Sequence, residues 1–353
     1  MKTRLFYSLL AIALFLSACS PAATSPTSTS AAPRTLLVMT HDSFSASQSV
    51  ITAFETANNA KVQFLASGDT GTALNKAILA KDNPFADVFY GVDNTFLSRA
   101  LSEGIFIPYK SSMLAEIPTK YQLDPQDRAL PVDWGDVCPI YDSLYFIQHN
   151  LQPPQNLEDL AKPDYKNLLV VENPATSSPG LSFLLTTIGH FGTDKYLDYW
   201  STLVANNVTV ENDWTAAFYT DYTISGGDKP IVISYNSDPA FEVLQATTPE
   251  TTPRTQVITG DDSCFMQIEF VGILEGTKNL DLAQKWVDFM LSPTFQEDMP
   301  LQMYVFPVNP NARLDPTLQK FLVVPASTAY VNPDEIAANR EAWINAWTET
   351  VLK

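Results

Sequence analysis

The sequence predicts an α/β protein of two lobes joined by a two-strand hinge. Apolar, strand-like runs alternate with helical patterns along most of the chain, which is typical of sheets with mainly parallel strands. Two such blocks, at about 34–133 and 139–262, are separated by extended segments near 133–140 and 262–272. The length of 353 residues exceeds one comfortable core and fits two α/β domains. Two extended crossings between two sheets would form a hinge beside a cleft that can close.

The first 18 residues are predicted to be an export signal. Lys2 and Arg4 precede an apolar run that is too short to span a bilayer, and the sequence Leu-Ser-Ala then leads to Cys19. Small residues before a cysteine are typical of bacterial lipoproteins, so we expect Cys19 to become the lipidated N-terminus after cleavage; an ordinary signal with an incidental cysteine is the alternative. Residues 19–33 are mostly Ser, Thr, Ala and Pro and predict a disordered tether. The body is therefore expected outside the cytoplasm, anchored to the membrane on its periplasmic side or at the cell surface.

The formal net charge of −18 argues against nucleic acid as a partner, because nucleic-acid binding needs basic stripes. An acidic body suits a small cationic or zwitterionic ligand, although surface acid can serve solubility alone. Cys138 and Cys264 remain after the signal is removed, and their even number allows either one disulfide or two buried thiols. The sequence contains no Cys or His spacing typical of a metal site, and we expect no cofactor and a monomer.

The elements of the first block follow from apolar runs and the residues that interrupt them. Residues 35–40 are a buried strand, and the segment at 67–71 ends a second strand before a helix begins. Asp93 and Asn94 close a third strand and can cap the helix after it. Strands are predicted at 35–40, 61–66 and 87–92, and helices through Val50 to Phe54, at 72–81 and at 95–103.

In the second block, residues 137–146 are predicted to be extended, and the apolar run 168–171 is a buried strand. Ser177 can cap the next helix, because Pro179 suits a first helical turn and Leu181, Leu184 and Ile188 recur at helical spacing. The remaining predicted helices are at 194–205, from Trp214, at 240–246, 282–291 and 333–351. The remaining strands are at 230–234 and 264–273, with a polar hairpin or loop at 247–263 and an irregular segment at 303–308.

Polar side chains occupy five strand-to-helix junctions. In open α/β sheets this edge is where ligands bind, and the start of a helix attracts anions. Any one junction is explained by helix capping, but five of them near several aromatic residues predict a site for a ligand with an aromatic end and an anionic end. The junctions are Asp42–Ser43, Asp69–Thr70, Asp93–Asn94, Thr176–Ser178 and Tyr235–Asp238, and the aromatic residues are Trp214, Tyr235, Phe241 and Tyr304. Core packing remains the alternative for any single ring, Phe241 above all.

Several segments, in this order, resemble the thiamine-binding subunit of bacterial ABC importers over nearly the whole mature chain. They are 42–44, 86–94, 173–181, 234–240, 291–296 and 338–344. The resemblance implies a two-lobed type II periplasmic-binding-protein fold that holds thiamine or its phosphates between the lobes and delivers it to a membrane permease. It also implies one lobe of residues 34–135 and 265–353, with C-terminal helices that cross back, and a second lobe of residues 136–264.

Position by position, the resemblance places ligand-binding residues at two ends of the site. The phosphate end comprises Asp69, Thr70, Ser177, Ser178, Trp214, Tyr235, Asn236, Ser237 and Asp238, and the ring end comprises His41 with Asp42, Phe241 and Tyr304. Three of these positions depart from the enterobacterial pattern but keep a flat ring: His41 and Phe241 replace tyrosine, and Tyr304 replaces tryptophan. Asp238 replaces a hydroxyl residue and adds a negative charge, so we expect thiamine diphosphate to bind more weakly than thiamine.

Other functions are compatible with parts of the sequence. A carrier of the same fold could bind a polyamine, a pyrimidine, a phosphonate or iron, although the adjacent tyrosines typical of iron carriers are absent. An enzyme is disfavoured, because the sequence contains neither Gly-x-Ser-x-Gly nor a glycine-rich phosphate loop. His41 beside Asp42 could act as a base, but a ring in the wall of a binding site is the more frequent role. A lipid-anchored sensor that signals to a receptor is not distinguished by sequence.

Overall fold

A computed structural model of the chain describes residues 32–247 and 252–353. The predicted signal peptide, the predicted lipidation site at Cys19 and most of the predicted tether lie outside the described residues. Contacts within Arg34–Lys353 are dense enough to make this region one unit. Among the described residues, no helix combines the length and the apolar character that a bilayer crossing needs.

One mixed sheet of eleven strands organises the fold, with the central order β2-β1-β3-β10-β5-β8-β6-β7. The strands at each end of this order pair in parallel, as predicted: β1 with β2 and β3, and β6 with β7 and β8. The strands are β1 (Arg34–Thr40), β2 (Ala60–Ala66), β3 (Val88–Asp93), β4 (Phe106–Ile107), β5 (Leu130–Asp142), β6 (Leu169–Glu172), β7 (Thr209–Glu211), β8 (Ile231–Tyr235), β9 (Thr255–Val257), β10 (Phe265–Leu274) and β11 (Phe306–Pro307).

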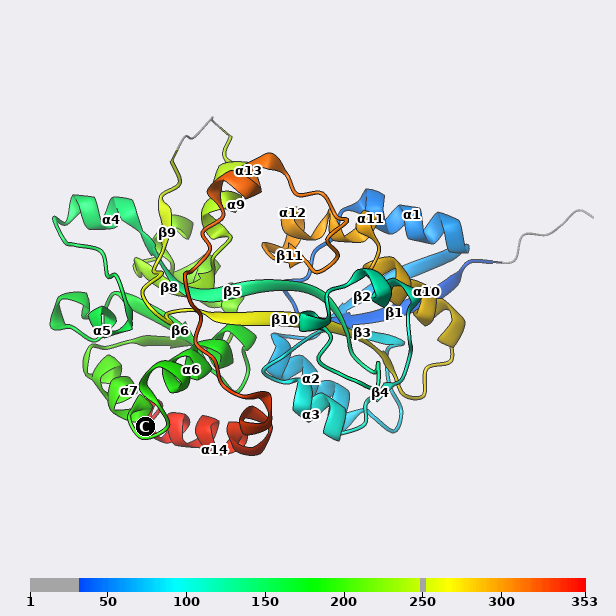
Figure 1. The fold of residues 1–353 in the computed structure, drawn as a ribbon, viewed down its shortest axis with the longest axis horizontal. Coiled ribbons are helices and arrows are strands. Elements are labelled where there is room, and N and C mark those ends of the chain that lie inside the picture. Colours follow the sequence, from blue (N-terminus) through cyan, green and yellow to red (C-terminus); the bar gives the residue numbers. More distant parts are fainter. Residues whose placement is uncertain (1–31, 248–251) are drawn as a thin grey trace, which may run out of the picture. The chain divides into compact units, whose positions relative to one another are not determined.

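The two long strands β5 and β10 cross the middle of the molecule (Figure 1). They pair with each other in antiparallel fashion, β10 then pairs with β3, and β5 with β8. These are the two predicted extended crossings, and they make the two-strand hinge of the type II fold. The sequence suggested two separate sheets; the structure has one continuous sheet, because the crossing strands hydrogen-bond to each other as well as to both ends.

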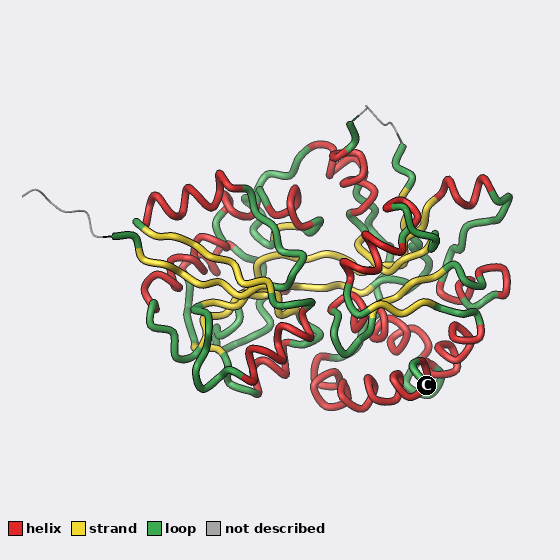
Figure 2. Tube along the Cα trace, turned by 180° about the vertical axis from the view of Figure 1, so that it is seen from behind, coloured by secondary structure: helices red, strands yellow, loops and turns green. Residues whose placement is uncertain are grey.

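Helices flank the strands on both faces of the sheet (Figure 2). Many begin at a side chain that accepts a hydrogen bond from the first turn, as Asp69, Ser177, Asp213 and Asn332 do. The helices are α1 (Gln48–Asn58), α2 (Thr70–Leu79), α3 (Leu97–Ser102), α4 (Ser143–Gln148), α5 (Leu157–Leu160), α6 (Ser178–Phe191), α7 (Tyr196–Ala205), α8 (Trp214–Ala216), α9 (Asp238–Gln245), α10 (Leu280–Met290), α11 (Pro293–Gln296), α12 (Met299–Met303), α13 (Pro316–Phe321) and α14 (Pro333–Val351). A π-helical turn, Ala217–Asp221, continues α8.

Helix α6 lies at the centre of the fold and packs against β5, β6, β8 and β10. Its cap is the predicted one: the Ser177 hydroxyl accepts a hydrogen bond from the Gly180 N–H, and Pro179 stands in the first turn. Nearly every residue from Ser178 to Ile188 is buried, which explains the apolar composition of this helix. The start of α6 is thereby held at the edge where the strands of the sheet end.

The hydrophobic core is continuous from one end of the sheet to the other. Trp286 of α10 packs edge-on against Phe54 of α1, with 4.9 Å between ring centroids. Trp347 of α14 meets Trp200 of α7 at 5.4 Å. The C-terminal helix α14 contacts both α7 and α3, and α13 contacts α9. The end of the chain therefore packs against elements from both ends of the sheet.

The structure corrects several predicted elements. Residues 143–148 form helix α4 and are not extended, because the Asp142 carboxylate caps the Leu144 N–H and Phe146 is buried against the core. Within residues 247–263, predicted as a hairpin or a loop, Thr255–Val257 forms strand β9, which pairs with β5. The helices α5 and α13 were not predicted, since segments of four to six residues are too short to show helical periodicity.

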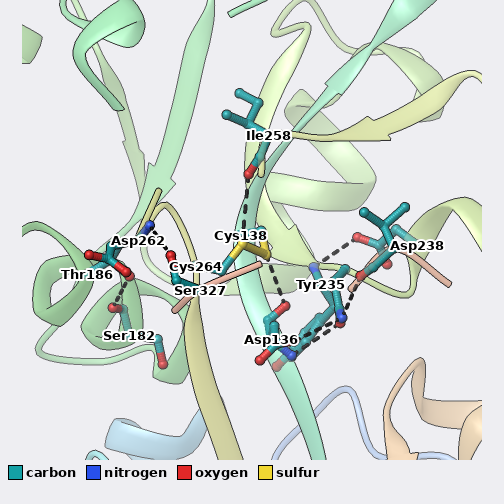
Figure 3. Close-up of a disulfide and its surroundings, with 12 residues drawn as sticks. Asp136, Cys138, Ser182, Thr186, Tyr235, Asp238, Ile258, Asp262, Cys264 and Ser327 are labelled. Atoms are coloured by element: carbon teal, nitrogen blue, oxygen red, sulfur yellow. Dashed lines mark hydrogen bonds between the residues drawn. A yellow bond between two sulfur atoms is a disulfide. The ribbon is translucent and has the colours of Figure 1, made fainter. Parts of the chain in front are cut away.

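Cys138 and Cys264 form a disulfide between β5 and the residue before β10 (Figure 3). Their Cα atoms are 4.3 Å apart, well below the separation of about 7 Å beyond which two cysteines cannot be bridged. The position follows from the register, because Val137 pairs with Phe265 and the two cysteines are the next pair along the antiparallel strands. Of the two states that the sequence allowed, the structure contains the disulfide, and it joins the two hinge strands.

Candidate functional site

A cavity of about 180 Å³ lies where the two ends of the sheet face each other. It is built from the segment after β1, the starts of α2, α6 and α8, the end of β8, the strand β10 and the turn after α12. The residues that line it are His41, Asp42, Ser43, Asp69, Thr70, Ser178, Pro179, Trp214, Thr215, Tyr219, Tyr235, Gln267, Glu269, Gln302, Met303, Tyr304 and Val305. Four of the five predicted junctions therefore converge on one space.

Eight of the predicted ligand-binding residues line this cavity. They are His41, Asp42, Asp69, Thr70, Ser178, Trp214, Tyr235 and Tyr304. These residues are up to 263 positions apart in the sequence, so only the folded chain brings them together.

Four further predicted residues lie behind the wall of the cavity. Ser177 is buried in the cap of α6. The Asn236 side chain donates to the Asp136 carboxylate and to the Val323 carbonyl. The Ser237 hydroxyl donates to the Tyr304 carbonyl. Phe241 packs against the Tyr304 ring, with 4.1 Å between centroids, so that its ring supports the wall from outside.

Asp238 does not occupy the position that the resemblance implied. Its Oδ2 accepts a hydrogen bond from the Tyr235 N–H at 3.1 Å, and the residue borders a neighbouring cavity together with Glu242 and Arg254. Burial raises the pKa of Asp238 to about 7. Because it caps the end of β8, this carboxylate does not place a charge in the wall, and any discrimination against phosphate must come from other residues.

Aromatic rings surround one part of the cavity. The Trp214 ring lies 5.5 Å from Tyr219, 6.3 Å from Tyr235 and 6.4 Å from Tyr304, each in an edge arrangement. Trp214 is fixed by its Nε1, which donates to the Ser234 hydroxyl at 3.0 Å. Tyr304 has a positive φ of 60°, an unfavourable conformation for an aromatic residue. This conformation directs the Tyr304 ring to the boundary between the two cavities.

The starts of α2 and α6 already have partners for their N–H groups. The Thr70 N–H donates to its own cap Asp69, and the Gly71 and Thr72 N–H groups donate to the Thr176 carbonyl from the other end of the sheet. At α6, the Gly180 N–H donates a hydrogen bond to the Ser177 hydroxyl oxygen. The anion-binding groups expected from sequence are therefore engaged within the protein in this conformation.

His41 is buried at the floor of the cavity. Its Nδ1 lies 2.8 Å from the Ser43 hydroxyl, and its Nε2, which has no hydrogen-bond partner among the described residues, lies 3.5 Å from Glu269 Oε1. Burial lowers the pKa of His41 to about 4, so the ring is neutral at physiological pH. Gly91 allows this placement, because an added Cβ would lie 2.4 Å from His41 Cδ2.

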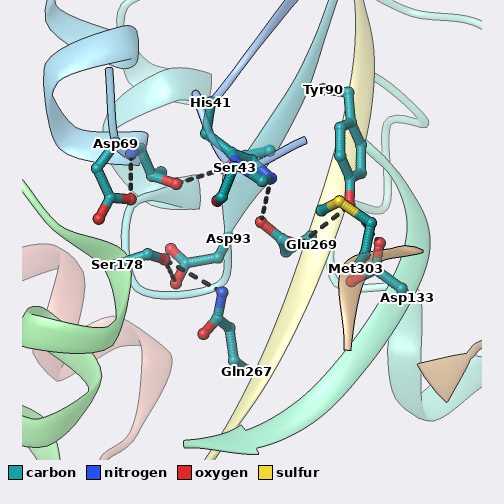
Figure 4. A network of polar contacts seen from close by, with 12 residues as sticks. His41, Ser43, Asp69, Tyr90, Asp93, Asp133, Ser178, Gln267, Glu269 and Met303 are labelled. Atoms are coloured by element: carbon teal, nitrogen blue, oxygen red, sulfur yellow. Dashed lines mark hydrogen bonds and ion pairs between the residues drawn. The ribbon is translucent and has the colours of Figure 1, made fainter. Parts of the chain in front are cut away.

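Acidic side chains give the cavity its electrostatic character (Figure 4). Asp42, Asp69 and Glu269 contribute to the wall, and no Lys or Arg does so among the residues that the structure describes. Burial raises the pKa of Asp69 to about 6, and burial followed by the charge of Asp213 raises the pKa of Asp42. A wall of this composition favours a ligand with positive charge. No group of three or more side chains suited to a metal ion is found in the described ranges.

Comparison with known proteins assigns the chain to a family. Residues 83–336 match the family described as bacterial extracellular solute-binding protein. The chain belongs to this family of solute-binding proteins. The thiamine-binding periplasmic protein of Escherichia coli (strain K12) is 31% identical over 90% of this chain and 94% of that protein. The thiamine-binding periplasmic protein of Brucella suis biovar 1 (strain 1330) is 29% identical over 89% and 91%.

A solved structure, titled periplasmic thiamin binding protein, has a TM-score of 0.80 to this solute-binding protein at 30% sequence identity. The match covers 91% of this chain and 98% of that chain. It confirms the two-lobed type II fold and the family resemblance that the sequence predicted.

Several residues in the wall of the solute-binding protein were missed by sequence analysis. Gln267 and Glu269 are two positions apart on β10, which places both side chains on the same face of the strand. Two polar residues alternating with apolar ones in a buried strand were the available signal. Tyr219 and Met303 carried no such signal, because their segments are helical and the direction of each side chain depends on tertiary packing.

Proposed function

We propose that this solute-binding protein is the extracytoplasmic component of an ABC importer and binds thiamine, or a thiamine phosphate, in the cavity between its lobes. The observation that carries the proposal is the composition of the wall, in which Trp214, Tyr235 and Tyr304 surround a space bordered by carboxyl groups. Thiamine combines two aromatic rings with a positive charge. The names of the relatives, at about 30% identity over nine tenths of the chain, agree with this ligand.

Each part of the wall suits one property of thiamine. Aromatic faces attract an organic cation by about 0.5–2 kcal/mol each, and more where water is excluded. Asp42 and Asp69 supply negative potential, and no Lys or Arg among the described residues lines the cavity to oppose it. Hydroxyl and amide groups of Ser178 and Gln267 offer hydrogen bonds to the polar edge of a pyrimidine.

The proposal includes the arrangement of the whole chain. Lobe 1 comprises residues 34–135 and 265–353, lobe 2 comprises residues 136–264, and α13 and α14 cross back from the first to the second. The protein acts as a monomer, is tethered to the membrane through lipid on Cys19, and delivers its ligand to a membrane permease. It carries the ligand without changing it chemically, so that it has neither an enzymatic activity nor a cofactor.

Calorimetric titration of the purified chain with thiamine tests the function. We expect one site per chain and a melting temperature that rises with thiamine concentration, because a ligand that binds only the folded state stabilises it by mass action. Spermidine, free aminopyrimidine and ferric citrate serve as competitors from the other ligand classes. A melting temperature that rises with one of these compounds but not with thiamine would assign the site to that compound's ligand class. A product other than thiamine after incubation would indicate an enzyme.

A further inference from the structure

Glu269 and Asp133 place two buried carboxyl groups opposite each other on the hinge strands. Glu269 of β10 pairs with Asp133 of β5 in the antiparallel register. Both residues are almost fully buried, with exposed fractions of 4% and 0%. Two ionised carboxylates at directly opposed positions repel each other strongly in a site with little water.

The hydroxyl of Tyr90 lies between the two carboxyl groups. It is 2.6 Å from Asp133 Oδ2 and 3.0 Å from Glu269 Oε2 (Figure 4). A phenol has one hydrogen and can donate it to only one of these oxygens. The two carboxyl groups also hydrogen-bond to each other. One of them must therefore carry a proton of its own, because two ionised carboxylates are both acceptors and cannot hydrogen-bond to each other.

The distances indicate which of the two groups is protonated. Hydrogen bonds from a hydroxyl to an ionised carboxylate are typically 2.5–2.7 Å long, and those to neutral partners are longer. The shorter contact therefore belongs to ionised Asp133, and the longer one to the protonated group, Glu269. Burial, followed by the charge of Asp133, raises the pKa of Glu269 well above its ordinary value, in agreement with this assignment.

Glu269 is also the member of the pair that reaches the cavity. The groups that face it are Asp133 from β5, Tyr90 and Asp93 from β3, His41 from the segment after β1 and Tyr235 from β8. None of these described groups supplies a positive charge, because His41 is neutral above a pKa of about 4. A cation in the cavity would be the first positive charge close to Glu269.

We propose that Glu269 carries a proton until a cationic ligand binds, and that the ligand displaces this proton and pairs with the carboxylate. The O–H bond of the Glu269 carboxyl group breaks, its electron pair stays on the oxygen, and the proton passes to the solvent. His41 does not retain it, because the low pKa of the buried ring makes it a poor acceptor near neutral pH. This inference rests on the proposed function, since it assumes that the ligand is an organic cation such as thiamine.

Titration calorimetry in two buffers of different ionisation enthalpy measures the released proton. At about pH 7.5, a value above the pKa of ordinary carboxyl groups, we expect wild-type protein to release up to one proton per thiamine bound. Glu269→Gln lacks the charge that would pair with the ligand, so it should bind thiamine at least about tenfold more weakly. This variant should release no proton on binding. Asp133→Asn removes the opposing charge but leaves Glu269 buried, so the pKa of Glu269 should fall, and thiamine should bind at no loss of affinity with less proton release than in wild type.

Glu172→Gln is the matched control. Glu172 is a fully buried carboxyl group whose pKa is also raised by burial, but it does not border the cavity. Proton release and affinity should be unchanged in this variant, and melting curves verify that each variant is folded. Equal affinity and equal proton release in Glu269→Gln and wild type would overturn the inference while leaving thiamine binding intact.

A spectroscopic measurement tests the inference without any ligand. The infrared difference spectrum between wild type and Glu269→Gln at neutral pH should contain the carbonyl band of a protonated carboxyl group. Absence of that band disproves the proposed proton on Glu269. If wild type does not bind thiamine at all, the proposed function fails, and the same band still decides whether Glu269 is protonated.

Discussion

The backbone N–H of Trp214 donates to the carboxylate of Asp69, with 3.2 Å between the nitrogen and Oδ2. Asp69 is also the cap of α2, and Trp214 is the first residue of α8, so this contact joins helix starts from the two ends of the sheet. The Trp214 ring is held by the Ser234 hydroxyl of β8, and the Trp214 backbone is held by Asp69 at the start of α2. The position of this part of the aromatic wall therefore depends on both ends of the sheet.

Replacement of Trp214 by alanine should weaken thiamine binding by about tenfold, because one cation–aromatic contact is worth about 0.5–2 kcal/mol. Trp214→Phe keeps a flat ring but loses the bond to Ser234, and we expect a smaller loss. Tyr330→Ala is the control, since this exposed ring lies away from the cavity. Calorimetry gives the three dissociation constants. Equal affinity of Trp214→Ala and Tyr330→Ala for thiamine would show that the Trp214 ring does not contribute to binding.

Thiamine diphosphate should bind at least about tenfold more weakly than thiamine, because like charges in a partly dry site repel by several kcal/mol. Asp238 was the reason expected from the resemblance, but it does not line this cavity, so we base the prediction on Asp42 and Asp69, which do. The Thr176 carbonyl also occupies the α2 N–H groups that a phosphate would need. Competition titrations of both ligands measure the ratio of their dissociation constants. Asp69→Asn removes one carboxylate from the wall and should bring this ratio closer to one. Tighter binding of the diphosphate would show that the cleft opens to expose these N–H groups.

The parts of the site that depend on local sequence could be predicted, and the parts that depend on strand register could not. Ser177 and Asp69 were recognised because a helix cap is defined by its own neighbours. The direction of the Glu269 side chain depends on which face of β10 meets the cavity, and this is set by pairing with β3 and β5.

The same distinction applies to the fold: elements defined by local sequence were predicted, and contacts between distant segments were not. The strands β1, β3, β6 and β8 were found because each is a short, continuous apolar run. Asp238 lies outside the cavity of Trp214 and Tyr235, and its carboxylate accepts from the Tyr235 N–H, a contact that the residue type alone does not indicate. The pairing of β5 with β10, which joins the strands into one sheet, was likewise not predictable from sequence patterns.

The melting temperature should fall as the pH rises from about 5 to 8. Burial raises the pKa of Asp238 to about 7 and those of Asp69 and Asp136 to about 6, whereas unfolded aspartates titrate near 3.9. The folded state thus binds more protons than the unfolded state in this interval, and its stability falls as these protons are lost. His41 acts in the opposite direction, because its lowered pKa adds stability as the pH rises from about 4 to 6.5, but it is one group against three.

Asp238→Asn isolates one contribution to this pH dependence. The amide keeps an oxygen that can accept from the Tyr235 N–H and cannot ionise, so the melting temperature should decrease less steeply with pH than in wild type. Asp228→Asn, at an exposed side chain, serves as the control and should follow the wild-type curve. Parallel curves for wild type and Asp238→Asn would mean that this carboxyl group does not change its protonation on folding.

Removal of the disulfide should lower the free energy of unfolding by about 2–5 kcal/mol, since the bond closes a long loop in the unfolded chain. Cys138 and Cys264 are separated by 126 residues. Urea unfolding of Cys138→Ala/Cys264→Ala measures the loss, and wild type under a strong reductant should match the double variant. Because β5 and β10 stay paired through their backbone, thiamine binding should persist. Identical midpoints with and without reductant would show that the bond contributes nothing to stability.

Substitution of Gly91 by alanine should destabilise the protein more than the same change at Gly104. Gly104 has a φ of 66°, in the left-handed region that an alanine can occupy with a strain of about 1 kcal/mol, whereas Gly91 has a φ of 109°, outside that region, where the strain is larger. At Gly104 an added Cβ meets open space among the described residues, whereas at Gly91 it lies 2.4 Å from His41 Cδ2. Overpacking of this kind adds about 1–3 kcal/mol, and displacement of the His41 ring would alter the wall of the cavity that His41 lines. Gly91→Ala should therefore lose both stability and thiamine affinity, and Gly104→Ala stability alone. Equal losses of stability in the two variants, measured by urea unfolding, would show that the His41 ring is free to move aside.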